Sequence, residues 1–490
     1  MDEDPQPTRA QATVEWAGLE QVPPGERHGT PARVGVLWFA AQLVPTAFFL
    51  GALGSADYIG LSLGHAMAAI VLGTTVGALA PAALSITGAR TGLPQLAYSR
   101  AVFGGGTALV GLFAFGTSIA FIALGCILGA EALDVTFGLP FLPAVALVFA
   151  CVAFVSTLGY RIMHTVERLM AVVVGAGFLL LTVQVVRHAG DVHLHQTVHG
   201  GDAAGSFGLL AAASFSFAFA WAHNAADYCR YLPADVSGVR LFVWVWAGIV
   251  SACVWLEGLG LLAGSLLPDT SAMAAVNHLV GGGAQGRLVL VALCLGVVAN
   301  ATVAQYSSGL QLMAAGVRLP RPMVTAMTGL VAFALTVYLH QGNLADRFTN
   351  VIFLASYWVG PFVGILAVHW WRRRPGRARA SANATGTGPR SSQYAAVTAQ
   401  VVGFLVCLPF SNTTLGTELA AHNAVLEALF GSVARGLLHG ADLAYPVGLV
   451  VGALVHLCLS RVRTERTPFT EPRREPDLLP HGRGDEVAAP

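Results

Sequence analysis

The sequence predicts an all-α integral membrane protein with twelve transmembrane helices. Its 490 residues are 55% hydrophobic and only 11% charged, whereas soluble domains carry roughly 25% charged residues. Twelve apolar runs reach the length of about 18 to 25 residues that a membrane-spanning helix needs. Arginine residues concentrate in alternate loops between these runs, which is the pattern of a multi-pass membrane protein.

The twelve apolar runs define the predicted spans in chain order. They cover residues 34–54, 60–86, 107–133, 139–158, 168–187, 207–226, 240–267, 287–314, 323–340, 348–371, 394–412 and 443–460. The first ~30 residues are polar and contain no short apolar core with a cleavage site, so we expect the first run to stay in the membrane.

The positions of the arginines orient the spans. With the amino terminus inside, the outer loops hold only Arg187, Arg287, Arg347 and Arg435, and the inner loops hold the majority. The positive-inside rule therefore predicts that both termini are cytoplasmic in the cell membrane, which requires an even number of spans. Span 1 then enters from inside and span 6 from outside, as two five-helix halves of inverted topology require.

The predicted organisation has five parts. They are a cytoplasmic arm (1–33), a ten-helix inverted-repeat core (34–371, with halves at about 34–187 and 207–371), a flexible polar linker (372–393), two additional transmembrane helices (394–460) and a disordered cytoplasmic tail (461–490).

The sequence lacks the residue patterns of disulfide frameworks, metal sites and several catalytic motifs. All seven cysteines fall within or at the edges of apolar runs and none belongs to a C-x-x-C pair, which predicts neither a disulfide framework nor a thiolate metal site. The loop from His188 to His199 has four histidines and Asp191 but not the protected ligand shell of a zinc site. No hydrolase triad, H-E-x-x-H motif or P-loop is present. We therefore expect no metal, no cofactor and no nucleic-acid partner.

Span 1 contains a proline about halfway across, in RVGVLWFAAQLVPTAFFLGAL. Pro45 has no N–H for the carbonyl of Ala41, so the helix is expected to kink or open there and to leave carbonyls and Gln42 free for a ligand. The alternative is a kink that serves packing alone. The local sequence leaves both interpretations open.

Polar groups gather where span 6 ends, in FSFAFAWAHNAADYCRYLP. Such groups are costly in a membrane unless they face a cavity or a partner. Trp221 is able to stack on a planar ring, and His223 or Asn224 offers hydrogen-bond donors and acceptors. The alternatives are an interfacial tryptophan and a histidine that serves packing. Asp227 and Arg230, three residues apart, suggest an ion pair or a helix stop instead.

Span 8 carries amide and hydroxyl groups in mid-run, in VVANATVAQYSSGLQ. Asn300 and Gln305 lie within about 140° of each other on a helix, with Thr302 and Ser308 near them. This arrangement suits a neutral, hydrogen-bonding substrate better than an ion. The alternative is hydrogen bonding between helices, which asparagine and glutamine provide in many membrane bundles.

Two motifs give the chain a family resemblance. TGARTGLPQLAYSRAVFG at 87–104 resembles the loop between spans 2 and 3 of the nucleobase–cation symporter-1 family, whose pattern is approximately G-x-R-x-G-x-P-x-x-x-x-S-R-x-x-F-G. WAHNAADYCRYLP at 221–233 resembles the same family's W-A-x4-D-[YF]-x-R-Y at the inner end of span 6. The twelve-span layout and the WFA of span 1 agree, so the resemblance covers roughly residues 26–460.

The family is similar to the five-plus-five inverted-repeat transporters of the LeuT type, and its members carry nucleobases, allantoin, hydantoins or vitamin precursors. The resemblance implies that Trp221 stacks on the substrate ring, and that Asn300 and Gln305 fall in the stretch of span 8 that supplies an amide. Two stretches depart from the family. AFIALGC (120–126) replaces a tryptophan or amide of span 3 and implies an apolar wall, and LGVVAN (295–300) lacks the hydroxyl ligands of sodium-coupled members.

The resemblance thus implies a secondary transporter that imports a nucleobase, cytosine or a purine, or a related planar heterocycle by cation symport with alternating access. The residues predicted to contact the substrate are Gln42, Pro45, Trp221, His223, Asn224, Asn300 and Gln305. The alternatives are a transporter of a vitamin precursor, hydantoin, allantoin or amino acid, a membrane enzyme, and a receptor. An enzyme would need titratable side chains that converge at one depth, and His223 is a single candidate.

The coupling ion is expected to be a proton, with sodium as the alternative. A sodium site of the family's type would take carbonyls of span 1, at Ala41 and Val44, and hydroxyls of span 8, where Thr302 is the nearest. A hard cation must exchange its water shell for oxygen ligands, so missing ligands weaken such a site. His223 is the proton-binding candidate at membrane depth, because histidine titrates near neutral pH. The expected partners are the heterocycle and the lipid bilayer, and the chain is expected to be a monomer or a loose oligomer.

Overall fold

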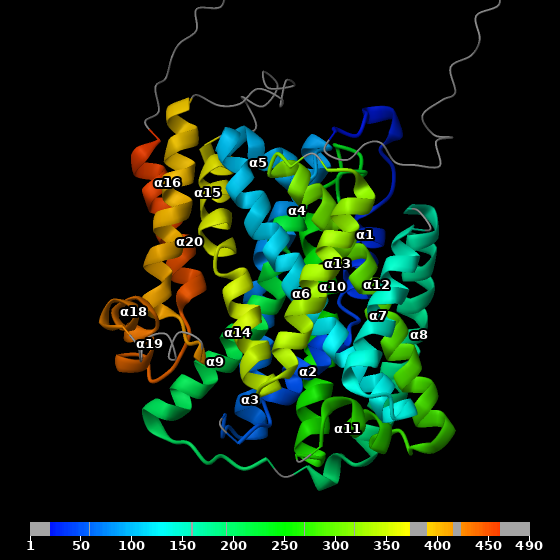
Figure 1. Cartoon of the computed structure of the whole chain (residues 1–490). Coiled ribbons are helices and arrows are strands. Elements are labelled where there is room, and N and C mark those ends of the chain that lie inside the picture. The colour runs from blue at the N-terminus through cyan, green and yellow to red at the C-terminus, as the bar shows by residue number, and fades with distance from the viewer. Residues whose placement is uncertain are drawn as a thin grey trace, which may run out of the picture. The chain divides into compact units, whose positions relative to one another are not determined.

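The computed structural model describes residues 20–57, 59–157, 160–192, 194–268, 270–317, 319–372, 390–414 and 423–460. Within these ranges the chain forms helices and connecting segments and no strand (Figure 1). Most of the predicted arm and linker and all of the predicted tail lie outside the described residues.

Span 1 is broken into two helices, as the position of Pro45 predicts. The helices α1 (Pro31–Ala41) and α2 (Pro45–Leu53) are bent by 62° relative to each other. Pro45 is the first residue of α2, where its missing N–H leaves no helical hydrogen bond unmade. Val44 before it is extended, as a residue that precedes proline prefers. The chain between the helices, at residues 42–44, is therefore non-helical backbone at membrane depth.

The remaining helices follow the predicted spans. The first half continues with α3 (Leu63–Gly77), α4 (Leu79–Thr91), α5 (Gln95–Phe103), α6 (Thr107–Phe137), α7 (Phe141–Thr157) and α8 (Tyr160–Arg187). The second half has α9 (Gly200–Phe219), the short 3₁₀ helix η5 (Ala220–Asn224), α10 (Gly238–Leu266), α11 (Ala272–Leu279), α12 (Gly283–Ala314), α13 (Arg321–His340), α14 (Leu344–Ser356) and α15 (Val359–Arg372). The last part has α16 (Arg390–Cys407), α18 (Ala424–Leu429), α19 (Ser432–Gly436) and α20 (Ala444–Leu459).

The number of spans agrees with the prediction except at two short helices. Nine helices among the described residues are long and apolar enough to cross a membrane, and the broken first span makes up to ten. The other two predicted spans correspond to α7 and α20, which are apolar but shorter. Length and composition therefore do not confirm the predicted count of twelve.

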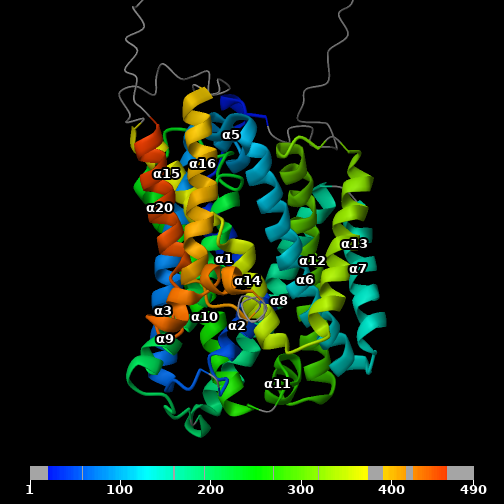
Figure 2. The ribbon, with the colours of Figure 1, turned by 60° about the vertical axis from the view of Figure 1, so that its left-hand side comes forward.

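Helices far apart in the sequence lie side by side. The helix α10 packs against α1, α2 and α3, and α3 lies along α9, so the first two spans gather with spans 6 and 7. The helix α6 packs along α12, which also contacts α7 and α8. A further group consists of α15, α16 and α20 (Figure 2). The first two groups meet where α2 contacts α6 and α12.

Glycines allow α2 and α10 to touch backbone to backbone. A Cβ atom at Gly51 of α2 would collide with the backbone carbonyl of Glu257 in α10. A Cβ atom at Gly260 of α10 would collide with the carbonyl of Phe48 in α2. Such close approach lets packing forces hold membrane helices together where the hydrophobic effect does not.

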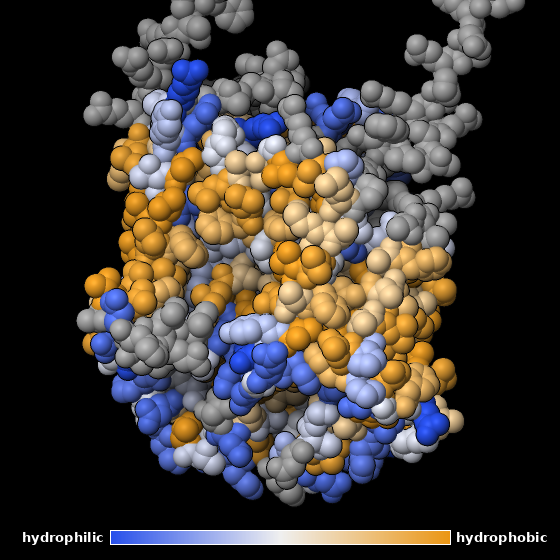
Figure 3. Space-filling model, in the orientation of Figure 1, coloured by the Kyte–Doolittle hydropathy of each residue, from blue (hydrophilic) through white to orange (hydrophobic). Residues whose placement is uncertain are grey.

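Apolar side chains cover much of the outer surface. Large exposed hydrophobic residues include Leu72 of α3, Phe154 of α7, Val172 of α8 and Leu330 of α13. Figure 3 shows a broad hydrophobic area, with hydrophilic residues gathered below it. Contiguous exposed apolar surface of this extent marks contact with a membrane or a partner, and the long apolar helices favour the membrane.

Candidate functional site

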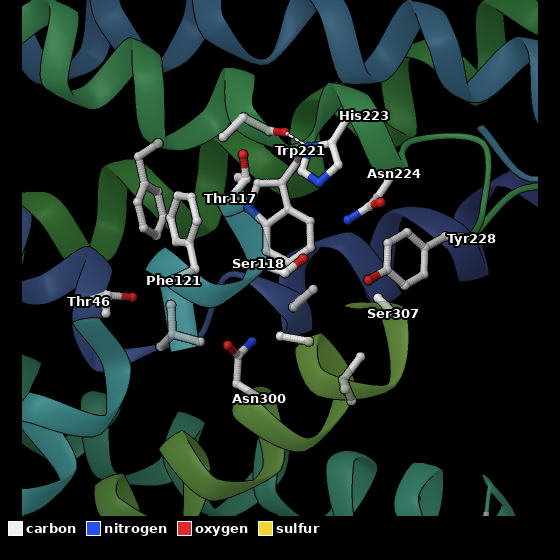
Figure 4. Close-up of a pocket in the computed structure, with 16 residues that line it drawn as sticks. Thr46, Thr117, Ser118, Phe121, Trp221, His223, Asn224, Tyr228, Asn300 and Ser307 are labelled. Carbon is white, nitrogen blue, oxygen red and sulfur yellow. Dashed lines mark hydrogen bonds between the residues drawn. The ribbon is translucent and has the colours of Figure 1, made fainter. Parts of the chain in front are cut away.

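A pocket lies where the break in span 1 meets α6, the end of α9 with η5, and α12 (Figure 4). It holds about 750 Å³ of space that no atom fills, including its opening toward solvent. Its lining residues are Ala41, Val44, Thr46, Thr117, Ser118, Phe121, Phe217, Ala220, Trp221, His223, Asn224, Tyr228, Asn300, Val303, Ala304 and Ser307. A small-molecule site typically has this mixture of apolar walls and a few convergent polar groups.

The break in span 1 forms one side of the pocket. It contributes Ala41, Val44 and Thr46. Pro45 shapes this side without lining it. Gln42 is fully buried, and its Oε1 accepts a hydrogen bond from the Sγ of Cys253 in α10 at 3.6 Å. The predicted role of Gln42 in substrate contact therefore needs correction, because its amide oxygen faces α10 instead of the pocket.

Trp221 presents its indole to the pocket from η5 (Figure 4). Its ring packs edge-on against the fully buried Trp38 of α1, with centroids 5.7 Å apart and an angle of 87° between the planes. Tyr228 contacts both indoles, at centroid distances of 5.1 Å from Trp38 and 6.4 Å from Trp221. Edge-on aromatic packing of this kind is favourable and directional. The other two rings thus hold Trp221 as a platform at the pocket wall.

His223 and Asn224 line the pocket from the same short helix. The ring of His223 is 4% exposed, and its Nδ1 lies 2.5 Å from the carbonyl oxygen of Ala220. A carbonyl only accepts hydrogen bonds, so Nδ1 carries the hydrogen and donates it. The Nε2 atom has no partner among the described residues, and in the neutral ring it is an acceptor. Asn224 adds an amide beside it (Figure 4).

One face of α12 completes the pocket. It presents Asn300, Val303, Ala304 and Ser307, which recur at the spacing of a single helix face. Gln305 lies on another face, where its Oε1 accepts from the hydroxyl of Ser156 in α7 at 3.0 Å. Its Nε2 donates to the carbonyl of Thr325 in α13 at 2.7 Å. The structure therefore brings Asn300 to the pocket and uses Gln305 to join helices, which corrects the predicted substrate contact of Gln305.

Two of the three predicted coupling-ion residues line the pocket and the third does not. Ala41 and Val44 line the pocket at the break. Thr302 is fully buried, does not line the pocket, and donates its hydroxyl hydrogen to the carbonyl of Val298 in its own helix at 2.8 Å.

The wall formed by α6 carries two hydroxyl groups that the sequence analysis did not single out. Thr117, Ser118 and Phe121 line the pocket. Thr117 Oγ1 accepts from the indole N–H of Trp358 at 2.9 Å, and Ser118 donates to Oε1 of Gln311 in α12 at 2.9 Å. Of the apolar stretch AFIALGC (120–126), Phe121 lines the pocket. This wall is therefore mixed and not apolar as expected, because the hydroxyls lie one helical turn before that stretch.

The two sequence motifs that carry the family resemblance pack against each other. The backbone N–H of Gln95, at the start of α5, donates to Oδ1 of Asp227 at 2.6 Å, and the Gln95 side chain accepts from the N–H of Ala226 at 3.3 Å. Burial raises the pKa of Asp227 to about 6, although the Gln95 hydrogen bond and nearby Arg230 both lower it. Asp227 thus holds two loops together and does not line the pocket.

A broken first span and a sixth span that ends in a 3₁₀ helix enclose a pocket with aromatic and amide walls. In a helical membrane fold, this arrangement defines the class of secondary transporters with a broken helix at their binding site. The chain belongs to the family of permeases for cytosine/purines, uracil, thiamine and allantoin, whose sequence model matches residues 21–448. It is therefore a membrane permease and not an enzyme, and the resemblance found from the two motifs is confirmed.

Proteins of this family are similar to the chain over most of its length. A candidate purine-cytosine permease of Bacillus subtilis is 26% identical over 467 residues, which cover 92% of this chain and 97% of that protein. A purine-cytosine permease of Emericella nidulans is 27% identical over 379 residues, which cover 73% of each chain.

The fold also matches that of a solved transporter. The structure of Mhp1, a nucleobase-cation-symport-1 family transporter in a closed conformation with bromovinylhydantoin bound, has a TM-score of 0.66 to this chain. The match covers 91% of this chain and 95% of Mhp1 at 16% identity. The predicted inverted-repeat fold of the LeuT type is thereby confirmed.

Proposed function

We propose that this protein imports a neutral planar nucleobase, cytosine or a purine, by symport with a cation. The observation that carries the proposal is the pairing of Trp221 and Asn300 across one pocket (Figure 4). Stacking of a base on an aromatic side chain contributes about 1–3 kcal/mol. An amide offers both donors and an acceptor to the edge of such a ring.

The lining is electrically neutral, and this favours a neutral solute. Its polar groups are the amides of Asn224 and Asn300, the ring of His223, one phenol and several hydroxyls. A charged solute in such a pocket would lose its hydration without gaining an opposite charge. Hydantoin and allantoin rings satisfy the same condition and remain rivals, whereas a cationic vitamin or an amino acid fits the lining less well.

For orientation, we infer that both termini are cytoplasmic. The support is the concentration of arginines in alternate loops, as the positive-inside rule requires. The oligomeric state expected from the sequence, a monomer or a loose oligomer, stays a prediction. For the coupling cation we favour a proton over sodium. The support is that Thr302 does not line the pocket at the break in span 1 and that LGVVAN (295–300) offers no hydroxyl.

Uptake by a bacterial host that lacks its own nucleobase transporters tests the proposal. Cells that express the chain are given labelled cytosine, adenine, hypoxanthine, uracil and allantoin, with unlabelled thiamine, pyridoxine and amino acids as competitors. We expect saturable uptake of cytosine or a purine that the vitamins and amino acids leave unchanged. Uptake of none of the bases, or competition by a vitamin or an amino acid alone, would contradict the proposal.

A further inference from the structure

The carboxyl group of Glu257 is buried within a membrane-spanning helix and completes no hydrogen bond with the described residues. Glu257 lies in α10, about 14 Å from the end of the helix at Leu266 for a rise of about 1.5 Å per residue. Its side chain is 0% exposed, and neither carboxyl oxygen has a hydrogen-bond partner among the described residues. Buried polar groups in proteins nearly always have such partners, so this exception requires an explanation.

Two hydroxyl groups from other helices are the polar neighbours of Glu257. Thr74 of α3 and Ser214 of α9 are close enough to interact with its carboxyl group. Both are fully buried, and within the described part of the chain neither hydroxyl completes a hydrogen bond. We call these three residues the Glu257 cluster. It places two hydroxyl groups, each able to donate or accept a hydrogen bond, beside one carboxyl group.

No described basic side chain neutralises the cluster. Cys253, one turn earlier in α10, is the titratable group that interacts with Glu257. The described charged and histidine side chains of α10 and of the helices packed against it lie near helix ends or on the surface: Arg33 of α1, His65 of α3, Arg90 of α4, Arg168 and Arg187 of α8, Asp202 of α9, Arg240 of α10 and His278 of α11. A carboxylate in this position therefore has to be accompanied by a proton or by a mobile cation.

The Glu257 cluster is connected to the pocket through α2 and α9. The backbone of α2 touches Glu257 at Gly51, where no Cβ atom fits, and the same helix lines the pocket at Thr46. Ser214 precedes the pocket residue Phe217 by one turn of α9. A change of charge at Glu257 would therefore act on the broken span 1 and on span 6, although the carboxyl group does not line the pocket.

We propose that Glu257, together with Thr74 and Ser214, binds the proton that is transported with the substrate, an inference that rests on the proposed function. The proton passes from water on one side to a carboxylate oxygen and returns to water on the other side, and no covalent bond within the substrate changes. While the helices around the cluster are closed, the proton neutralises the buried carboxyl group. Its release requires α2, α3, α9 and α10 to separate and admit water, so proton transfer and alternating access are linked.

This assignment moves the coupling site away from His223. The Nδ1 hydrogen of His223 is donated to Ala220, and the ring lines the substrate pocket. We therefore assign His223 to the substrate and Glu257 to the proton.

The test uses purified protein in liposomes with labelled cytosine and hypoxanthine. The parent protein should accumulate a base when the outside is more acidic than the inside. Glu257→Gln, which keeps the size and polarity of the side chain but cannot release a proton, should exchange labelled for unlabelled base and lose accumulation. Glu131→Gln is the matched control, because the carboxyl group of Glu131 already accepts a hydrogen bond from the N–H of Met273 at 2.8 Å. This control should accumulate the base like the parent.

Undiminished proton-driven accumulation by Glu257→Gln would overturn the proposal, and so would accumulation that follows a sodium gradient and ignores pH. Infrared difference spectra of the carboxyl band during acid–base titration give a readout that needs no substrate. The parent and Glu131→Gln should show a titrating band that Glu257→Gln lacks, and a spectrum unchanged by Glu257→Gln would also refute the proton site. A retained band in a protein that transports no base would contradict the proposed function instead.

Discussion

At the scale of residues, the pocket separates side chains that face the solute from side chains that hold them. The indole of Trp221 faces the pocket. The ring of Trp38 packs against it in a T-shaped arrangement, and the ring of Tyr228 packs against it at a tilt. A side chain fixed in this way before binding loses little conformational freedom when the solute arrives. The aromatic contact therefore contributes mainly to affinity.

Trp221→Ala should lower the affinity for the transported base by about 10- to 100-fold, since stacking is worth about 1–3 kcal/mol. Trp221→Phe should lie between this variant and the parent, because a smaller ring still stacks. Binding of labelled base to purified protein measures the effect. Trp244→Ala, at a half-exposed position on the surface of α10, is the control and should bind like the parent. Unchanged affinity of a folded Trp221→Ala protein would remove Trp221 from the site.

The two amides of α12 should respond differently to substitution. Asn300→Ala should weaken binding by about tenfold, the effect of one lost hydrogen bond of about 1.4 kcal/mol. Gln305→Ala should leave affinity nearly unchanged and lower the melting temperature, because Gln305 joins α12 to Ser156 and Thr325. Binding assays and thermal unfolding in detergent separate the two effects. The reverse pattern would show that Gln305 carries the substrate contact.

Of the residues predicted to contact the substrate, Trp221, Asn224 and Asn300 line the pocket, whereas Gln42 and Gln305 do not. One physical reason accounts for the difference. The helical period gives the angle between two side chains but not which face of the helix meets the pocket. An amide is equally suited to a ligand and to a neighbouring helix. Only the packing of α10 against α1 and of α7 against α12 decides between these two uses.

At the scale of elements, the break in span 1 is easier to recognise in the sequence than the change of helix type at the end of span 6. Pro45 has no N–H for a helical hydrogen bond to Ala41, so this single residue predicts the break in span 1. The change from α9 to η5 has no proline or glycine near Ala220. There the ring of His223 donates to the carbonyl of Ala220, and side-chain competition of this kind for backbone groups is harder to recognise in a sequence.

Pro45→Ala should restore an N–H at residue 45 and allow α1 and α2 to join. Substrate binding should weaken, because Ala41, Val44 and Thr46 line the pocket only while the chain is open there. The folded protein should be no less stable in thermal unfolding, since a helical hydrogen bond is gained. Pro233→Ala, in the loop before α10, serves as the control for loss of a proline. Parent-like uptake by Pro45→Ala would mean that the break serves packing alone.

The contact between the loops of α5 and η5 should make stability depend on pH. The pKa of Asp227 rises from 3.8 to about 6 on folding, so the native state binds this proton more tightly than the unfolded state does. Its contribution to stability is present below about pH 4 and is lost as the pH rises through about 6. Asp227→Asn keeps an oxygen that accepts from the Gln95 N–H and should flatten this part of the pH profile. Melting temperatures between about pH 4 and about pH 8 measure it, and an identical slope in parent and variant would contradict the assignment.

At the scale of the whole molecule, hydropathy predicts the spans well because burial in lipid imposes one condition on about 20 residues at once. The predicted runs therefore recur as helices along the chain. Hydropathy does not predict which helices pack against each other, since almost every side of a membrane-spanning helix is apolar. The Glu257 cluster shows the limit, because its three members come from three helices and no local pattern relates them.

The last prediction is that a proton gradient, and not a sodium gradient, drives the whole transport cycle in cells. A sodium site at the break would combine the carbonyls of Ala41 and Val44 with hydroxyls of α12. Thr302 does not line the pocket at the break, and LGVVAN before it has no hydroxyl, so a hard cation would lack oxygen ligands there. Uptake should rise as the external pH falls, collapse with a protonophore and stay constant when choline replaces sodium. A sodium requirement at constant pH would contradict this prediction and place the ion between the break in span 1 and the hydroxyl of Thr302.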